Sequence, residues 1–187
     1  MTSLNLSLAD IPSLTGKRVI ISGASSGIGL ATAQLFAEKG AWVLNLDINP
    51  PPKADTNIEY RNCDITKWDQ LVSGFQHAGT IDMAIANAGV LEDSSFLGDD
   101  IDLSKDGSTI AEPTYRILDI NIRATMNFTK LAIASFRGAK RDGSIVLLAS
   151  AAGYWSEPSL PIYSATKAAV SATGSIPFHK TSLGTIC

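Results

Sequence analysis

The feature that most constrains the fold is a regular alternation of short apolar runs with helix-like segments. Each apolar run has the length of a buried strand and is bounded by glycine, proline or polar residues. This alternation predicts right-handed crossovers and an α/β fold, a doubly wound parallel sheet in three layers. The predicted strands are 18–22, 41–47, 58–62, 82–86 and 144–149, and the predicted helices are 30–39, 67–76, 114–137 and one beginning at Tyr163.

A glycine-rich loop follows the first predicted strand. Gly23, Gly27 and Gly29 lie between that strand and the first helix. Without side chains there, backbone N–H groups and the helix dipole can approach a pyrophosphate. The loop therefore predicts a Rossmann-like, dinucleotide-binding version of the fold, although glycines also serve ordinary tight turns.

Asp47 ends the second predicted strand, eighteen residues after Gly29. A carboxylate at this place can accept hydrogen bonds from the adenosine ribose, and it would repel a phosphate on that ribose. No Lys or Arg occurs in the glycine loop or directly after Asp47. We therefore predict NAD in preference to NADP. The alternative is a simple turn residue before Asn49 and Pro50.

A serine, a tyrosine and a lysine occur close together near the C-terminal end. Tyr163 and Lys167 are four residues apart, so on a helix their side chains share one face. The ammonium would stabilise the phenolate, which suits proton transfer near neutral pH. Ser150 follows a predicted strand, which places its hydroxyl at the edge of the sheet where ligands bind. A solvated helix face is the alternative for the tyrosine and lysine.

Composition excludes several classes of function. The 187 residues are 45% apolar, which is enough for one sizeable core, and we see no repeat or domain boundary. A net charge of −3 without a basic run predicts no nucleic-acid or membrane partner. No targeting or membrane-spanning pattern is present, so we expect a cytoplasmic protein. Cys63 and Cys187 lack metal-ligand spacing, so we predict reduced thiols and no metal.

Several further motifs, in a fixed order, make the chain resemble a short-chain dehydrogenase/reductase of the compact, single-domain type. The resemblance runs from about residue 17 to about residue 170 and implies one NAD(P)-binding domain over 1–187. Its motifs are the glycine loop, Cys63-Asp64-Ile65, Asn87-Ala88-Gly89, Asn121 in the long helix, Ser150 thirteen residues before Tyr163, and Lys167.

The resemblance implies catalytic roles. Tyr163 would be the general acid or base, and Lys167 would hold the nicotinamide ribose and stabilise the tyrosinate. Ser150 would hydrogen-bond the reacting oxygen. Asn121 would anchor a water that links Lys167 to solvent. Equally, an asparagine at this position could kink the helix or be a buried polar residue whose hydrogen bonds are all made within the protein.

The resemblance also implies cofactor contacts. Asp64, next to Ile65, would bond the adenine amine, or it could cap the following helix. Asn87, with Ala88 and Gly89, would brace the strand end beneath the cofactor, or form a plain turn. The glycine loop would contribute Gly23, Ser25, Ser26, Gly27, Ile28 and Gly29.

Two segments depart from the family pattern. Residues 91–113 are long and polar, which fits either a substrate-side loop or a disordered surface excursion. In the atypical tail 171–187, Gly174 and Pro177 would end the helix early, and no strand pattern follows. We therefore expect a sheet that lacks its last strands, with strand 144–149 at an exposed edge, and a truncated product.

Two functions follow from these observations. The first is an oxidoreductase that moves a hydride between NAD(H) and a secondary alcohol or ketone. The second is a catalytically impaired remnant that binds nucleotide or a full-length relative.

Tyr154 and Trp155, just after Ser150, would form an apolar substrate wall or belong to the core. Family members associate through the two helices at 114–137 and Tyr163, but the short C-terminus makes a homo-oligomer doubtful.

Overall fold

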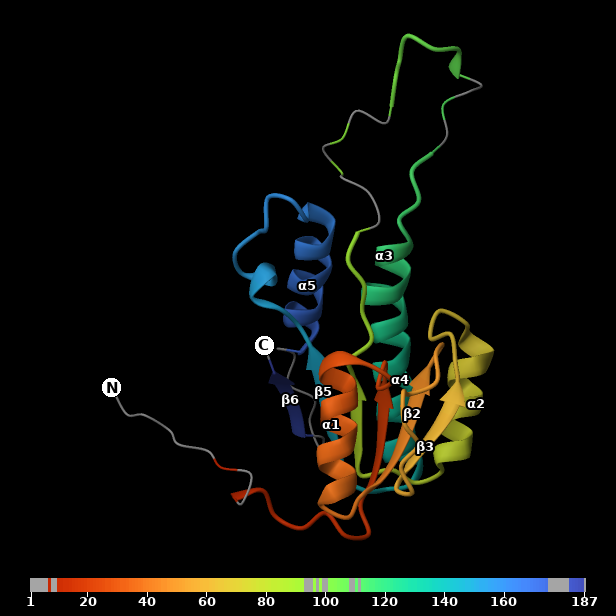
Figure 1. Cartoon of the computed structure of the whole chain (residues 1–187), viewed down its shortest axis with the longest axis vertical. Coiled ribbons are helices and arrows are strands. Elements are labelled where there is room, and N and C mark those ends of the chain that lie inside the picture. Colours follow the sequence, from red (N-terminus) through yellow and green to blue (C-terminus); the bar gives the residue numbers. More distant parts are fainter. Residues whose placement is uncertain are drawn as a thin grey trace, which may run out of the picture.

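A six-stranded parallel sheet, in the order β3-β2-β1-β4-β5-β6, forms the middle layer of the molecule (Figure 1). The computed structural model describes residues 7, 10–92, 96, 98, 101–107, 110, 112–174 and 182–186. The strands are β1 Arg18–Ser22, β2 Trp42–Asp47, β3 Ile58–Asn62, β4 Met83–Ala86, β5 Ser144–Leu148 and β6 Ser182–Ile186.

Helices cover both faces of this sheet, and the predicted doubly wound, Rossmann-like fold is confirmed (Figure 1). One long helical segment combines α3, a π-helical turn η3 and α4. The helices are α1 Gly27–Glu38, α2 Trp68–Ala78, α3 Arg116–Leu118, η3 Asp119–Ala124, α4 Thr125–Gly138, the 3₁₀ turn η4 Ala151–Gly153 and α5 Pro161–Gly174.

The sequence located most of these elements closely. The predicted strands 18–22 and 58–62 are confirmed at both ends, and β2, β4 and β5 each differ by one residue at one end. Helix α1 begins three residues earlier than predicted, at Gly27, because the glycine loop itself enters the first helical turn. Helix α5 ends at Gly174, as predicted for a glycine stop.

The expectation that no strand follows α5 is wrong. β6 pairs in parallel with β5, from Ser144 opposite Ser182 to Leu148 opposite Ile186. β5 is therefore an interior strand, and the sheet does not end there. The segment 182–186 reads SLGTI, without an apolar run or strict alternation, so local sequence gives little signal. Pairing with the backbone of β5 determines its conformation instead. Pro177 lies outside the described residues.

Two apolar layers hold the helices against the sheet. On one face, the small side chains of Ala33 and Ala37 let α1 pack closely on Val19 and Ile21 of β1. On the other face, α2 and α4 pack together, and the rings of Phe75 and Phe128 meet edge to face with centroids 5.0 Å apart. Burial on both faces explains why the central strands are mostly apolar.

The partly buried residue Asp82 links the amino-terminal ends of β1, β4 and β5. Asp82, just before β4, accepts hydrogen bonds from the backbone N–H of Arg18 at 2.9 Å, from Lys17 Nζ at 3.3 Å and from Arg141 Nη2 at 2.8 Å. Its own carbonyl accepts from the N–H of Ser144 at 3.1 Å. Desolvation raises the pKa of the Asp82 carboxyl, but these donors outweigh it and hold that pKa below its usual value.

We expect Asp82→Asn to lower the free energy of unfolding by about 1–2 kcal/mol at pH 7, because a charge-assisted set of hydrogen bonds is weakened. The folded pKa of Asp82 is depressed, so its contribution is present above the unfolded value near ~3.9 and is lost as pH falls through the folded value. Urea unfolding at pH 7 and pH 3 measures both effects. Asp142→Asn, an exposed neighbour, is the matched control. Equal losses at both pH values would contradict the ionic origin.

Candidate functional site

A pocket of about 540 Å³ lies at the carboxyl ends of the central strands, where open α/β sheets bind ligands. The glycine loop and Tyr163 both line this pocket, so they lie on the same side of the molecule. The predicted site residues that line it are Gly23, Ser26, Gly27, Ile28, Asp47, Asp64, Ile65, Asn87, Ala88, Gly89 and Tyr163. The other predicted site residues are not among its lining residues: Ser25, Gly29, Asn121, Ser150 and Lys167.

The glycine loop needs its glycines for two different reasons. Gly23 and Gly27 have φ values of +72° and +52°, a backbone region that disfavours side chains. Gly29 is required by close packing, because a β-carbon there would overlap the Gly23 carbonyl and the Asn87 side chain. The turn therefore lies directly against the loop that follows β4.

The residues 87–92, called here the β4 loop, are fixed to β1 by Asn87. Its Nδ2 donates to the carbonyls of Ser22 and Gly23 at 3.1 and 2.8 Å. Ser22 Oγ in turn accepts from the N–H groups of Asn87 and Ala88 at 3.1 and 3.2 Å. Asn87 thus braces the end of β1.

A buried asparagine that the sequence analysis missed supports the glycine loop from below. Asn45, in β2, has no solvent exposure. Its Oδ1 accepts from the N–H of Ala24 at 3.1 Å and its Nδ2 donates to Ser25 Oγ at 2.9 Å. The available signal was a polar residue inside the apolar run WVLNLD. A buried amide in a strand needs partners, and here the partners are the loop.

Asp47 organises a turn and also lines the pocket. One carboxylate oxygen accepts from the N–H of Ser25 at 3.0 Å and the other from the N–H of Asn49 at 3.0 Å, so it does organise a turn. The side chain also lines the pocket. Each carboxylate oxygen has a second lone pair, which remains available to a ligand hydroxyl.

Asp64 does not cap the next helix, since the residue before α2 is Lys67 and that helix start has no side-chain cap. Instead, Asp64 Oδ1 accepts from the N–H and the hydroxyl of Thr66 at 2.9 and 2.7 Å. Desolvation raises the pKa of Asp64, but the Thr66 hydrogen bonds and the nearby cations Lys67 and Arg116 lower it by more. Asp64 therefore carries an ionised, pocket-facing carboxylate at neutral pH.

Tyr163 and Lys167 lie on the first two turns of α5. Lys167 Nζ is 5.7 Å from the centre of the Tyr163 ring and donates to the carbonyl of Leu148 at 2.7 Å. Lys167 is buried, with 6% of its surface exposed, and this burial lowers its pKa. A β-carbon on Gly89 would lie 3.5 Å from Lys167 Nζ, so the ammonium lies directly beside the β4 loop.

Ser150 caps the turn η4, and its Oγ accepts from the N–H of Ala152 at 3.2 Å. This turn packs tightly on α5, because a β-carbon on Gly153 would lie 2.8 Å from the carbonyl carbon of Lys167. Tyr154 and Trp155 follow, and their 63% and 81% exposure rules out the core alternative.

Asn121 lies in the π-helical turn η3, a type of turn that often marks functional sites. Its Oδ1 accepts from the N–H of Val90 at 2.9 Å, and its Nδ2 donates to the Val90 carbonyl at 2.9 Å and to Thr166 Oγ1 at 3.1 Å. It is therefore a satisfied buried polar residue on an irregular helix, and it joins the β4 loop to α5.

The last two residues of the β4 loop, which also begin the long polar segment 91–113, lie close to the site. Leu91 lines the pocket, and Glu92 Oε2 accepts from the N–H of Tyr163 at 2.6 Å. Glu92 had no role in the sequence analysis, because the two residues are 71 positions apart. Residues 101–107 extend beyond the carboxyl ends of the strands (Figure 1).

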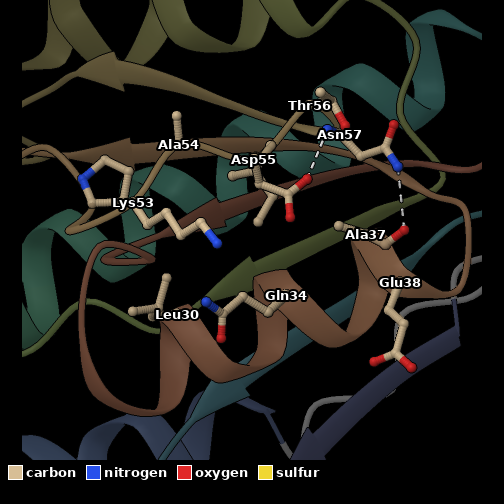
Figure 2. A pocket seen from close by; sticks show the side chains of 11 residues that line it. Leu30, Gln34, Ala37, Glu38, Lys53, Ala54, Asp55, Thr56 and Asn57 are labelled. Carbon is tan, nitrogen blue, oxygen red and sulfur yellow. Dashed lines mark hydrogen bonds between the residues drawn. The ribbon is translucent and has the colours of Figure 1, made fainter.

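A second recess, of about 670 Å³, lies between α1 and the connection from β2 to β3 (Figure 2). Lys53 and Gln34 extend into it, and Asn57 closes one end with a hydrogen bond from its Nδ2 to the Ala37 carbonyl at 3.4 Å. None of the predicted site residues lines this recess.

Along the described part of the chain, no three His, Cys, Asp or Glu side chains gather as metal ligands would. No described helix combines the length and apolar character that crossing a membrane requires.

Two curated fungal proteins are similar to this chain over most of its length. The short-chain dehydrogenase/reductase prx4 of Penicillium roqueforti is 45% identical over 169 residues, which cover 89% of this chain and 50% of that protein. The short-chain dehydrogenase/reductase ATR7 of Stachybotrys chlorohalonatus is 38% identical over 177 residues, which cover 91% and 54%. The chain thus spans about half the length of these relatives.

Solved structures agree with the fold. Ligand-free aldohexose dehydrogenase of Thermoplasma acidophilum gives a TM-score of 0.75 at 29% identity, covering 93% of this chain and 66% of that one. The 3-ketoacyl-(acyl-carrier-protein) reductase of Brucella melitensis, complexed with NADH, gives 0.70 at 28% identity, covering 87% and 69%. Residues 17–174 match the family model of the short chain dehydrogenases, and the chain belongs to this family of oxidoreductases.

Proposed function

We propose that this chain binds NAD(H) along the pocket and transfers a hydride between it and a secondary alcohol or ketone. The observation that carries the proposal is the joint lining of one pocket by the glycine loop and Tyr163, with the Lys167 ammonium beside the ring. The NADH complex of the similar Brucella reductase supports the choice of cofactor class.

The residues present fit a dinucleotide. Helix α1 begins beside the pocket with Ser26 as its first flanking residue, and no side chain caps its free N–H groups. Apart from its chain neighbours and the backbone of its own helix, no atom lies within 4 Å of the place where Gly27 would carry a β-carbon. This open helix end can hold a pyrophosphate. When bound, the nicotinamide supplies the hydride acceptor or donor.

The adenosine half is expected beside two carboxylates. Asp47 would accept hydrogen bonds from the ribose hydroxyls, and Asp64 would accept from the adenine amine. Arg116 is the only basic side chain among the described residues that line the pocket, and it lies near Asp64. The negative charge of Asp47 would therefore meet a ribose phosphate without a neighbouring cation, and this favours NAD over NADP.

Proton transfer is assigned to α5 and the turn after β5. Tyr163 would give a proton to the carbonyl oxygen, or take one from the alcohol. Lys167 would stabilise the phenolate and bind the nicotinamide ribose, and its burial strengthens the attraction between opposite charges. Ser150 would donate a hydrogen bond to the reacting oxygen. The exposed rings of Tyr154 and Trp155 favour an apolar substrate.

We expect Tyr163→Phe to reduce kcat/KM at least about 100-fold, because general acid–base catalysis is removed. The dissociation constant for NADH should change less than about twofold. Stopped-flow or steady-state rates on a panel of secondary alcohols and ketones, together with NADH fluorescence titration, measure the two quantities. Tyr60→Phe, on β3 away from the pocket, is the matched control. Unchanged turnover would remove Tyr163 from the mechanism, and NADH binding without any turnover in the parent chain would favour a nucleotide-binding module.

Replacing Asp47 tests the cofactor preference. Asp47→Asn retains an oxygen acceptor but removes the charge, so the ratio of the NADPH to the NADH dissociation constant should fall at least about tenfold. Fluorescence titrations with both cofactors measure this ratio. Glu38→Gln removes a charge from the exposed side of α1, at the second recess, and should leave the ratio unchanged. A parent chain that binds NADPH more tightly than NADH would contradict the preference.

Cys63 offers a probe of occupancy at the adenosine end of the pocket. Burial, together with the nearby carboxylates of Asp64 and Asp69, raises the pKa of its thiol to about 11, although Arg61 partly opposes this. In a Cys187→Ser background, alkylation by iodoacetamide should therefore be slow at pH 8 and accelerate up to about pH 11. NADH should slow it further, since Cys63 lines the pocket. Alkylation that NADH leaves unchanged would place the nucleotide elsewhere.

A further inference from the structure

The start of helix α5 has no local cap. Its first residue is Pro161, which has no N–H, and the preceding residue is Leu160, whose side chain accepts no hydrogen bond. The N–H of Ser164 bonds the Leu160 carbonyl at 3.0 Å. The N–H of Tyr163 has no partner within the helix, as expected for the first turn. It donates to Glu92 Oε2 at 2.6 Å.

This hydrogen bond is stronger than an ordinary cap. It is short and charge-assisted, and the carboxylate lies at the positive end of the helix dipole. The other carboxylate oxygen, Glu92 Oε1, is buried and accepts no hydrogen bond from the residues that the structure describes. Holding a charged group in this way costs free energy, which a small amide or hydroxyl cap would avoid.

Because Glu92 belongs to the β4 loop, its hydrogen bond to the Tyr163 N–H connects that loop to α5. Glu92 is the last residue of the β4 loop, and Val90 in the same loop is held by Asn121. Gly89, one residue earlier, lies beside Lys167. The loop that borders the cofactor pocket is therefore joined directly to the backbone of the tyrosine itself.

We propose that Glu92 is a positioning residue for the reaction, which fixes the first turn of α5 and thereby sets where the Tyr163 hydroxyl meets the substrate oxygen. This inference rests on the proposed function. A displacement of about 1 Å at such a group lowers turnover far more than binding. A purely structural cap would instead affect the stability of the whole helix.

The first test is amide hydrogen exchange by NMR on the nucleotide-free protein, comparing Glu92→Ala, Glu92→Gln and the parent. In Glu92→Ala, the Tyr163 amide should exchange about tenfold faster, with Val170 in the middle of α5 unchanged. Glu92→Gln keeps an oxygen acceptor and should restore most of the protection. Glu157→Ala is the control, since Glu157 is exposed close to the same helix and its carboxylate bonds Ser159.

The second test separates kcat from cofactor binding. Glu92→Ala should lower kcat about tenfold with the NADH dissociation constant within twofold of the parent, and Glu92→Gln should recover most of the loss. Unchanged exchange at Tyr163, equal acceleration at Val170, or a Glu92→Gln variant that behaves like Glu92→Ala would overturn the inference. If the parent chain neither binds NADH nor turns over, the proposed function fails, while the exchange result still decides whether Glu92 holds Tyr163.

Discussion

The packing of the glycine loop against the β4 loop is the contact on which the candidate site depends. Asn87 donates to two carbonyls of the first loop, and Gly29 leaves room for that side chain. A larger residue at Gly29 would separate β1 from the loop after β4. The pocket lies at this junction, where the sheet continues from β1 to β2 on one side and to β4 on the other.

Polar contacts between residues far apart in the sequence join α5, which carries Tyr163 and Lys167, to the ends of the central strands. Asn121 connects Val90 to Thr166, Lys167 reaches the Leu148 carbonyl, and Glu92 reaches the Tyr163 backbone. Each contact links α5 to the end of a central strand or to the loop after it. The geometry of the tyrosine and lysine is therefore set by the sheet as much as by the helix.

The sequence predicted what depends on local pattern. Apolar runs identified five strands to within one residue at each end, and Pro161 with the Ala-rich run after it located Tyr163 and Lys167 on one helix, α5. It missed what depends on pairing across the fold. The sequence of β6 has only a weak strand pattern, and this strand forms by pairing with β5. Asn45 is a polar residue within an apolar run, and its role becomes clear only from its hydrogen bonds to the glycine loop. Glu92 stands in a polar segment without a motif, and only the fold brings it to Tyr163.

The chain belongs to the short chain dehydrogenases and has their fold, and the proposed position of the dinucleotide rests on the contacts of this chain. A crystal structure of the chain with NADH tests this account most directly. We expect the pyrophosphate at the start of α1, the adenosine between Asp47 and Asp64, and the nicotinamide ribose at Tyr163 and Lys167. NADH in the recess between α1 and β3, or a nicotinamide turned away from Tyr163, would contradict it.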